Sequence, residues 1–256
     1  MDAILQTMRG ISLEEMNSIK LMNRVDTKYL ATKAQLCPLL GRAAGLYSVL
    51  DIGGNRLCDY DTLYYDTDSY GMYLDHHNRR LTRQKIRTRR YLSSGSTFLE
   101  VKRKNNHGRT KKMRISIPES EFFSFEGDVA AAGFLESKSD FMAGELSPST
   151  RTVFRRMTLV NNARTERLTV DMDLHFHNLR TGGRADLGDA VIIELKQDGF
   201  CRSDIKEILL DMRVKPLRIS KYCVGTVLTE PAIRHSRFIR KIRTVEKLTH
   251  NKLLTR

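Results

Sequence analysis

The sequence predicts an α+β fold that is built around a mostly antiparallel β-sheet. Several segments alternate charged and apolar residues at a period of two, the spacing at which strand side chains point to opposite faces. Short polar turns such as SSGS and NNHG separate the first three of these segments, and amphipathic segments with capping residues lie around them. With 256 residues, the chain is long enough for one domain with an appendage.

Two helices are predicted before these strands. Ser12 and Glu15 have the spacing of a capping box ahead of LEEMNSIKLM, and Thr32 can cap the segment TKAQLCPLL. Both segments are amphipathic, as expected of helices that cover a sheet.

The first three predicted strands, within residues 81–117, each have a charged and an apolar face. Residues on the apolar side include Leu99, Val101, Met113 and Ile115. The opposite side carries, strand by strand, Arg83, Lys85, Arg87 and Arg89; then Phe98, Glu100, Lys102 and Lys104; then Thr110, Lys112, Arg114 and Ser116. The short turns between the three strands predict an antiparallel meander.

The remaining elements follow in the second half of the chain. Pro118 stands at a plausible first helical turn of PESEFFSFEG, and Ser203 can cap SDIKEILLDM. Two more strands with one charged face lie between them, and these faces carry Arg167, Thr169, Asp171 and Asp173, then Glu194 and Lys196. The basic segment 229–256 predicts a helix with an apolar stripe of Ile233, Phe238, Ile242 and Leu248, which packs on the domain or binds an anionic partner.

The charged strand faces are mainly of one sign. Residues 83–114 contain a single acidic residue, Glu100, and the whole chain has a net charge of +14. At an effective dielectric near 20, two like charges about 4 Å apart repel by roughly 4 kcal/mol, so such a face favours a bound anion. A sheet that curls with this face inward would form a basic tunnel covered by helices. From periodicity alone, a solvated face over a helix-packed core remains the alternative.

Several functional classes lack support in the sequence. It contains no G-x-x-x-x-G-K-[ST] loop and no G-x-G-x-x-G after a strand, so phosphate must be held by side chains. His76 with His77, and His175 with His177, lack partners at metal-ligand spacing and are interpreted as strand-end or solvent-facing residues.

The cysteines and the apolar segments indicate a cytoplasmic protein. Cys37, Cys58, Cys201 and Cys223 include no C-x-x-C pair, which suits reduced thiols better than disulfides or a zinc site. The N-terminal segment does not have the pattern of a secretion signal, and no apolar run reaches the length of a membrane span.

Nine short stretches in a fixed order resemble a known family. They are RVDTKYL, LYYDTDSYGMYLDHHN, KIRTRRY, LEVKRK, TKKMR, FRR, RLTVD, IELK and SKY. Their order and spacing are similar to those of VTC domains, the catalytic domain of the vacuolar transporter chaperone complex and its bacterial relatives. That family consists of polyphosphate polymerases with a triphosphate tunnel (CYTH-like) fold. The resemblance spans about residues 20–226, so we expect a VTC-like tunnel domain over 1–228 and a basic helical tail over 229–256.

The resemblance also implies roles for individual residues. The wider tunnel superfamily opens with an E-x-E-x-K strand, whereas this chain has Arg24, Asp26 and Lys28, which favours the polymerase branch. Phe154 replaces the tyrosine of a family Tyr-x-Arg pattern, so a hydroxyl contact is lost there. The catalytic tunnel lining implied by the resemblance is Lys28, Arg87, Arg89, Lys102, Lys112, Arg156, Arg167, Lys196 and Lys221. Arg83, Lys85, Arg90 and Lys104 are expected to have surface roles.

Substrate and metal contacts complete the expected site. Arg114 and Ser220 would bind substrate, the latter beside Lys221. Glu194 resembles the metal-binding glutamate of the family and Glu100 is a candidate second ligand, for Mn²⁺ or Mg²⁺. The alternative for both glutamates is a salt bridge with neighbouring lysines inside the barrel.

The leading functional hypothesis is an ATP-dependent polyphosphate polymerase. It would transfer the γ-phosphoryl group of ATP to a growing inorganic polyphosphate chain, and a membrane partner would be encoded separately. A tunnel triphosphatase acting on inorganic or nucleoside triphosphate is the second hypothesis. A non-catalytic module that binds stored polyphosphate or RNA is the third, and nucleic acid is disfavoured because aromatic residues are not interleaved with the cations.

Overall fold

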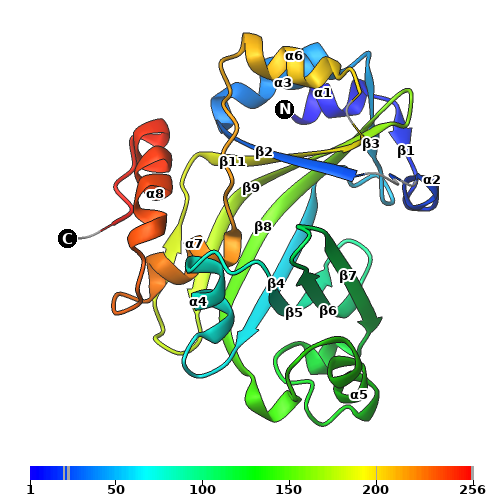
Figure 1. Ribbon diagram of the computed structural model, residues 1–256. Helices are drawn as coiled ribbons and strands as arrows, with labels where there is room; N and C mark the ends of the chain where they lie inside the picture. Colours follow the sequence, from blue (N-terminus) through cyan, green and yellow to red (C-terminus); the bar gives the residue numbers. More distant parts are fainter. Residues whose placement is uncertain (20, 22–23, 200, 255–256) are drawn as a thin grey trace.

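A curled antiparallel sheet forms the centre of the molecule in the computed structural model, which describes residues 1–19, 21, 24–199 and 201–254 (Figure 1). Along the sheet the strands follow the order β2-β11-β9-β8-β4-β5-β6-β7, and β1, β3 and β10 are attached at its sides. The strands are β1 Gly10–Ile11, β2 Arg24–Thr32, β3 Tyr47–Leu50, β4 Cys58–Asp66, β5 Arg83–Tyr91, β6 Ser96–Lys104, β7 Thr110–Ser116, β8 Ser147–Asn161, β9 Glu166–Asn178, β10 Arg184–Asp186 and β11 Ala190–Asp198. Every strand pair is antiparallel except β1 with β3, which confirms the predicted α+β class with a mostly antiparallel sheet.

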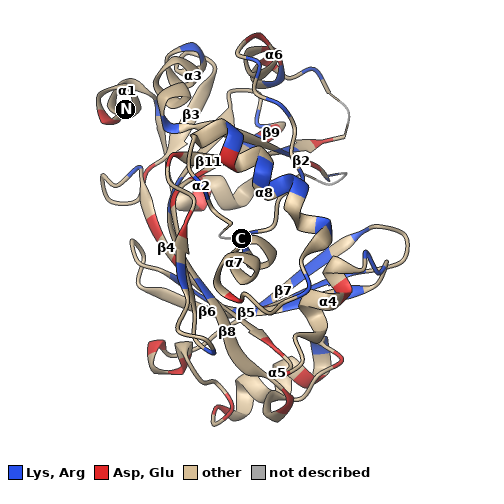
Figure 2. Cartoon of the chain, turned by 90° about the vertical axis from the view of Figure 1, so that its left-hand side faces the viewer, with Lys and Arg blue, Asp and Glu red and all other residues tan. Residues whose placement is uncertain are grey.

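The sheet forms a half-barrel. Its path ends at β2 and β7, and these two strands do not pair with each other in the described part of the chain. Helices α7 (Lys221–Thr229) and α8 (Ser236–Thr249) lie against the concave side (Figure 2). Val224 of α7 and Val245 of α8 belong to the same buried cluster as Phe154 and Ile192 of the sheet. Helices therefore cover the concave side that a closed barrel would enclose with strands.

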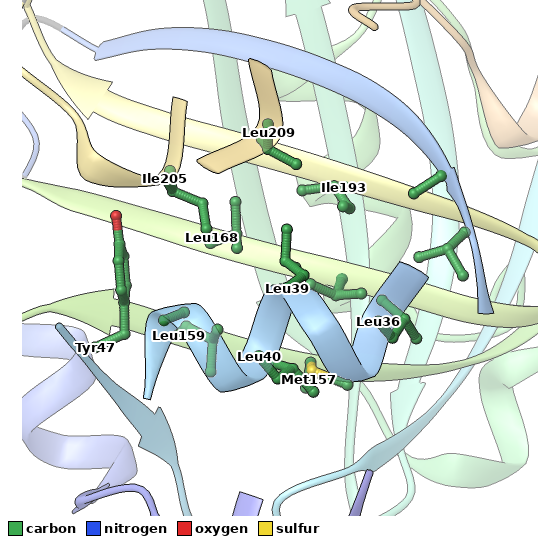
Figure 3. Close-up of a cluster of buried hydrophobic side chains, with 14 of the residues drawn as sticks. Leu36, Leu39, Leu40, Tyr47, Met157, Leu159, Leu168, Ile193, Ile205 and Leu209 are labelled. Atoms are coloured by element: carbon green, nitrogen blue, oxygen red, sulfur yellow. The ribbon is translucent and has the colours of Figure 1, made fainter. Parts of the chain in front are cut away.

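The convex side of the sheet packs against four other helices. These are α1 Asp2–Thr7, α3 Leu36–Ala43, α5 Val129–Lys138 and α6 Asp204–Asp211. Helix α4 (Gly71–His77) instead packs through Tyr73 on α7 and α8, and α2 (Leu13–Ser18) packs through Met16 on Val160 of β8. In the largest cluster, Leu39 and Leu40 of α3 and Leu209 of α6 pack on apolar strand residues such as Leu168 and Ile193 (Figure 3). Full burial of each leucine contributes about 1.5–3 kcal/mol. A second cluster around Phe122 packs on β5, β6 and α5.

The predicted meander and its charged face are confirmed for β5, β6 and β7. Leu99 and Val101 are fully buried on the convex side, and the charged residues of these strands occupy the other face. The turn from β6 to β7 closes through hydrogen bonds between Asn105 and Arg109, and Gly108 adopts a φ of 79°, which a residue with a side chain rarely adopts.

Capping residues predicted the starts of two helices correctly, whereas 3-10 turns form at the other two predicted starts. Ser12 and Glu15 form the predicted capping box, and the side chain of Ser203 accepts a hydrogen bond from the Lys206 backbone. Thr32 precedes a short 3-10 turn, Lys33–Gln35, which runs into α3. The helix predicted after Pro118 is wrong in extent, because only a 3-10 turn forms over Glu119–Phe122 before Phe122 enters the core.

One predicted strand face is wrong at its end. Asp173 was expected on the charged side with Asp171, but its backbone adopts a φ of 52° in a bulge of β9, where Asp173 and Leu174 lie opposite the single residue Phe154 of β8. The extra residue reverses the alternation, so Asp173 pairs with Lys33 and Arg155 on the other side of the sheet.

The basic C-terminal segment forms the predicted helix, α8. Phe238, Ile242 and Val245 are buried and Leu248 is partly buried, so the apolar stripe faces the domain. Among the described residues, no helix combines the length and apolar character needed to cross a membrane.

Candidate active site

The register of the meander places cations beside one another on the concave face. Lys102 of β6 lies between Lys85 of β5 and Lys112 of β7, directly opposite both in the strand register. In the next row, Glu100 lies between Arg87 and Arg114. Cross-strand neighbours on one face are close enough for like charges to destabilise the sheet. The two rows thus differ, since only the second contains a carboxylate.

Lys102 has no anionic partner. Among the described residues its ammonium group forms no ion pair and no hydrogen bond. Burial, with the nearby charge of Lys85, lowers the pKa of Lys102 from 10.5 to about 8 despite the attraction of Glu194. This cation is therefore under repulsive stress that a bound anion would relieve.

Glu100 holds two of the predicted cations in place. Its carboxylate is 1% exposed and accepts hydrogen bonds from Arg87 at 2.5 and 2.8 Å and from Lys112 at 3.0 Å. Burial opposes ionisation, but Arg87, Arg89 and Lys112 keep the pKa of Glu100 well below its usual range. Both carboxylate oxygens accept hydrogen bonds from cations. Glu100 therefore matches the alternative stated for it, a salt bridge inside the barrel, better than a metal ligand.

A second buried carboxylate, Asp171, organises the opposite wall. Arg156 donates two hydrogen bonds to it, at 2.5 and 2.8 Å, and Lys221 donates a third. Arg156 also lies over the ring of Tyr60, 4.9 Å from its centroid. Burial lowers the pKa of Lys221 to about 8, although Asp171 favours its charged form. Asp171 is not among the predicted site residues, because its role depends on a contact with α7.

Glu194 of β11 lies between two lysines. Its carboxylate pairs with Lys196 at 2.6 Å, and Lys28 approaches at 3.9 Å. Lys28 also donates a hydrogen bond to the Ile219 carbonyl, at 3.2 Å. Burial opposes ionisation, yet Lys196 and Lys28 hold the pKa of Glu194 well below its usual value.

The start of α7 places Ser220, like Lys221 beside it, on the concave face. Ser220 caps the helix through the Cys223 backbone and accepts a hydrogen bond from Lys85 at 2.8 Å. The surface role expected for Lys85 is wrong, because its ammonium group points inward and burial lowers its pKa. Helix α7 is itself fixed by Tyr222, whose hydroxyl donates to the buried carboxylate of Asp66.

Three predicted cations, Arg89, Arg114 and Arg167, form no ion pair with Glu100, Asp171 or Glu194 among the described residues. Arg89 is buried, bonds to Thr62 and lies 5.6 Å from the Tyr60 ring centroid. The Arg167 guanidinium is turned toward α2, where it donates to the Met16 carbonyl at 2.6 Å. Exposed Arg114 stacks on Phe98 at 4.3 Å. By contrast, Arg90 lies on the convex side, where it pairs with Asp61 and Glu119.

A comparison with protein families covers the segment that contains this arrangement of residues. The VTC domain family matches residues 23–229, most of the chain, and this match contains both walls described above. The chain belongs to the VTC domain family. Comparison with curated protein sequences found no match.

Solved structures with a similar course of the chain have low sequence identity to this VTC domain. A candidate adenylate cyclase from Vibrio parahaemolyticus is 12% identical with a TM-score of 0.48, covering 80% of this chain and 99% of its own. A candidate adenylyl cyclase from Hippeastrum, described as having a dominant triphosphatase activity, is 14% identical with a TM-score of 0.48 and covers 80% and 95%. A protein from Pyrococcus horikoshii is 14% identical with a TM-score of 0.44 and covers 79% and 97%. At these values the likeness says nothing about the reaction of the VTC domain.

Tyr64 joins the site of this VTC domain although the sequence did not single it out. Its hydroxyl accepts a hydrogen bond from Arg87 at 3.2 Å, and its ring stacks on Tyr222 with centroids 4.9 Å apart. Burial alone would raise the pKa of the Tyr64 phenol, but Arg87 and three other nearby cations bring it down to about 7. Tyr64 lies in LYYDTDSYGMYLDHHN, one of the stretches that resemble VTC domains, but its position opposite Arg87 depends on strand register and is seen only in the structure.

The donor set of the VTC domain fits a divalent metal only in part. No group of three His, Cys, Asp or Glu side chains that could hold a metal lies within the described ranges. Mg²⁺ and similar ions need only one or two protein carboxylates when substrate phosphates and waters supply the other ligands. Glu194 meets that requirement better than Glu100. In the part of the chain that the structure describes, Lys196 occupies one oxygen of Glu194 while the other is 3.9 Å from Lys28, whereas both oxygens of Glu100 accept hydrogen bonds.

The histidines and two surface cavities lie apart from this constellation. His76 and His77 belong to α4 and His77 is buried, so the expectation of strand-end or solvent-facing positions is wrong for this pair. A cavity of about 290 Å³ is bordered by Arg9 and Arg164, and another of about 230 Å³ by His175. Neither cavity is lined by the predicted tunnel residues. In the structure those residues lie instead along the concave face of the half-barrel.

Proposed function

We propose that this VTC domain is a polyphosphate polymerase that transfers the γ-phosphoryl group of ATP to the end of an inorganic polyphosphate chain. The observation that carries the proposal is Lys102, a cation that has no ion-pair partner in the described ranges and lies in register between two further lysines. The neighbouring row of the sheet has an acid, Glu100, that pairs with its cations, whereas the row of Lys85, Lys102 and Lys112 has none. A polyphosphate supplies the missing negative charge along an extended path.

Phosphoryl transfer depends mainly on alignment and charge neutralisation. In the proposed reaction the bond from the γ-phosphorus to the β-bridging oxygen breaks, a bond to the terminal oxygen of the chain forms, and ADP leaves. Arg87 and Arg156 are held rigidly by buried carboxylates, so their remaining N–H groups are oriented before substrate arrives. Lys102 and Lys112 add charge from the neighbouring strands.

Glu194 is the residue that would hold Mn²⁺ or Mg²⁺ together with substrate phosphates. Such an ion, when bound, neutralises charge on the phosphate oxygens. The lysines beside Glu194 keep its carboxylate ionised, which is the form that binds a cation. Their own positive charges would be balanced by the phosphate that shares the ion.

Product analysis with ATP and Mn²⁺ tests the proposal. The purified chain should form ADP and polyphosphate in matching amounts, the polymer being detected by gel electrophoresis and by its digestion with an exopolyphosphatase. Release of orthophosphate without polymer would reject the polymerase in favour of a triphosphatase. Binding of polyphosphate without ATP turnover would reject both and leave a binding module.

Triphosphate affinity should fall as the pH rises from 7 to 9. Lys102 and Lys221 have pKa values of about 8, so both lose positive charge in this range, and the Tyr64 phenol, with a pKa of about 7, gains negative charge. We expect roughly tenfold weaker binding of inorganic triphosphate at pH 9, measured by calorimetry.

The stability of the unliganded protein should change in the opposite direction. Unfolding returns the pKa of Lys102 to about 10.5, so between pH 8 and 10.5 the unfolded chain binds more protons. The contribution of this lysine to folding thus becomes more favourable as pH rises. For the binding experiment, a triphosphate affinity that is unchanged between pH 7 and 9 would contradict the assignment of Lys102 and Lys221 to the anion site.

A further inference from the structure

The exposed face of α8 carries a row of cations that the site above does not use. Arg237, Arg240, Arg243 and Lys247 are all exposed, at spacings of three, three and four residues that place them along one side of the helix. The row, called here the α8 ridge, extends over about 15 Å at 1.5 Å per residue. Within the described chain none of the four forms an ion pair. The helix lies beyond the residues that match the VTC family.

The α8 ridge is continuous in charge with the concave face. Lys241, on the same helix, is half-buried, and the charges that act on it include those of Arg79, Arg83 and Arg218. His76 lies at the meeting point, where Lys28 and Lys85 of the concave face and Lys241 of α8 all act on its ring. The charged groups that act most strongly on His76 come from both regions and are all cationic, and the His76 ring lies 6.1 Å from the ring of Phe238 of α8, between centroids.

The chemistry of the ridge selects among anionic partners. Its side chains are Arg and Lys, and the helix's aromatic residue, Phe238, is buried against the domain, so bases of a nucleic acid would find nothing on which to stack. The apolar stripe of α8 also faces the protein, so the helix has no apolar face with which to enter a lipid surface. A flexible polyanion without bases or lipid fits this surface best.

We propose that the α8 ridge is a binding track for the part of a polyphosphate chain that extends beyond the concave face. The inference rests on the proposed function for the nature of its ligand. A chain long enough to occupy both regions would bind through both, whereas we expect triphosphate to bind among Lys85, Lys102 and Lys112 without using the ridge. Length dependence is consequently the signature of the track.

The test compares two variants that lose the same number of charges. The ridge variant combines Arg237→Gln, Arg240→Gln, Arg243→Gln and Lys247→Gln, and Gln preserves the helix propensity of these exposed positions. The control combines four exposed cations outside both regions: Arg9→Gln, Lys111→Gln, Arg184→Gln and Arg213→Gln. Binding of long-chain inorganic polyphosphate and of inorganic triphosphate is measured for each at several salt concentrations.

The ridge variant should bind long-chain polyphosphate at least tenfold more weakly than the control, with triphosphate affinity unchanged. By analogy with single-stranded nucleic acids, losing four contacts should make the slope of log affinity against log salt shallower by about 3. Equal losses in the two variants would overturn the track, as would a parallel loss of triphosphate binding. Tighter binding of single-stranded RNA than of polyphosphate, abolished in the ridge variant, would also overturn it.

The outcome is separable from that of the proposed function. If the wild-type chain makes no polymer from ATP, the polymerase proposal fails, while the difference between ridge and control variants still decides whether α8 binds polyphosphate. If polymer forms normally in the ridge variant and long chains bind as in the control, only the track fails.

Discussion

Replacing Asp171 with Asn should destabilise the protein more than any other single substitution in the concave face. The carboxylate is 1% exposed and is the partner of both Arg156 and Lys221. Removing one partner of a buried ion pair leaves uncompensated charge and typically costs about 3–5 kcal/mol. We therefore expect the melting temperature to fall by roughly 10 °C, and ATP turnover to be lost because Arg156 is no longer fixed.

Asp173→Asn provides the matched control for this experiment. Asp173 is two residues away on the same strand and also pairs with two cations, but its partners Lys33 and Arg155 are on the partly exposed convex side. Exposed ion pairs contribute about 0–1 kcal/mol, and Asn accepts the positive φ of this position. Equal melting temperatures for the two variants, measured by calorimetry, would show that Asp171 does not anchor the wall.

Replacing Lys102 with Met should separate activity from stability. The lysine has no ion-pair partner among the described residues and lies between Lys85 and Lys112, so its removal relieves repulsion in the folded protein. We expect an unchanged or higher melting temperature together with a loss of about 10²- to 10³-fold in ATP turnover, the usual range when one electrostatic stabiliser of a transition state is removed.

Lys111→Met is the control for Lys102. Lys111 is exposed on the opposite face of β7, so it tests the loss of one positive charge without touching the concave face. Its turnover should stay within a factor of two or so of wild type. Lower stability and lower turnover together in Lys102→Met would indicate that this lysine supports the fold and not the chemistry.

Period-two alternation predicted the strands and, apart from Asp173, the side of the charged strand residues, because the pleat alone fixes the side in a regular strand. It could not predict the row of Lys85, Lys102 and Lys112, since register depends on how the two turns close. Nor could it place the Lys85 side chain, whose partner Ser220 lies 135 residues away.

The errors have local or tertiary causes. The bulge at Asp173 reverses the alternation through one backbone angle, which no period-two pattern reveals. Asp171 looked like any other charged strand residue, and its anchoring role appears only when α7 brings Lys221 to it. The cations of the concave face could be predicted from charge and resemblance, whereas the roles of the carboxylates that hold them required tertiary contacts.

The half-barrel leaves β7 as a terminal strand whose outer backbone groups have no partner strand within the described residues. An unpaired edge of this kind is a template for adding strands from other molecules, and lysines on an edge are a common protection against it. Lys111, Lys112 and Arg114 occupy that edge. Substitutions that neutralise them to test the proposed anion site should therefore be checked for aggregation, because the same charges also protect this edge.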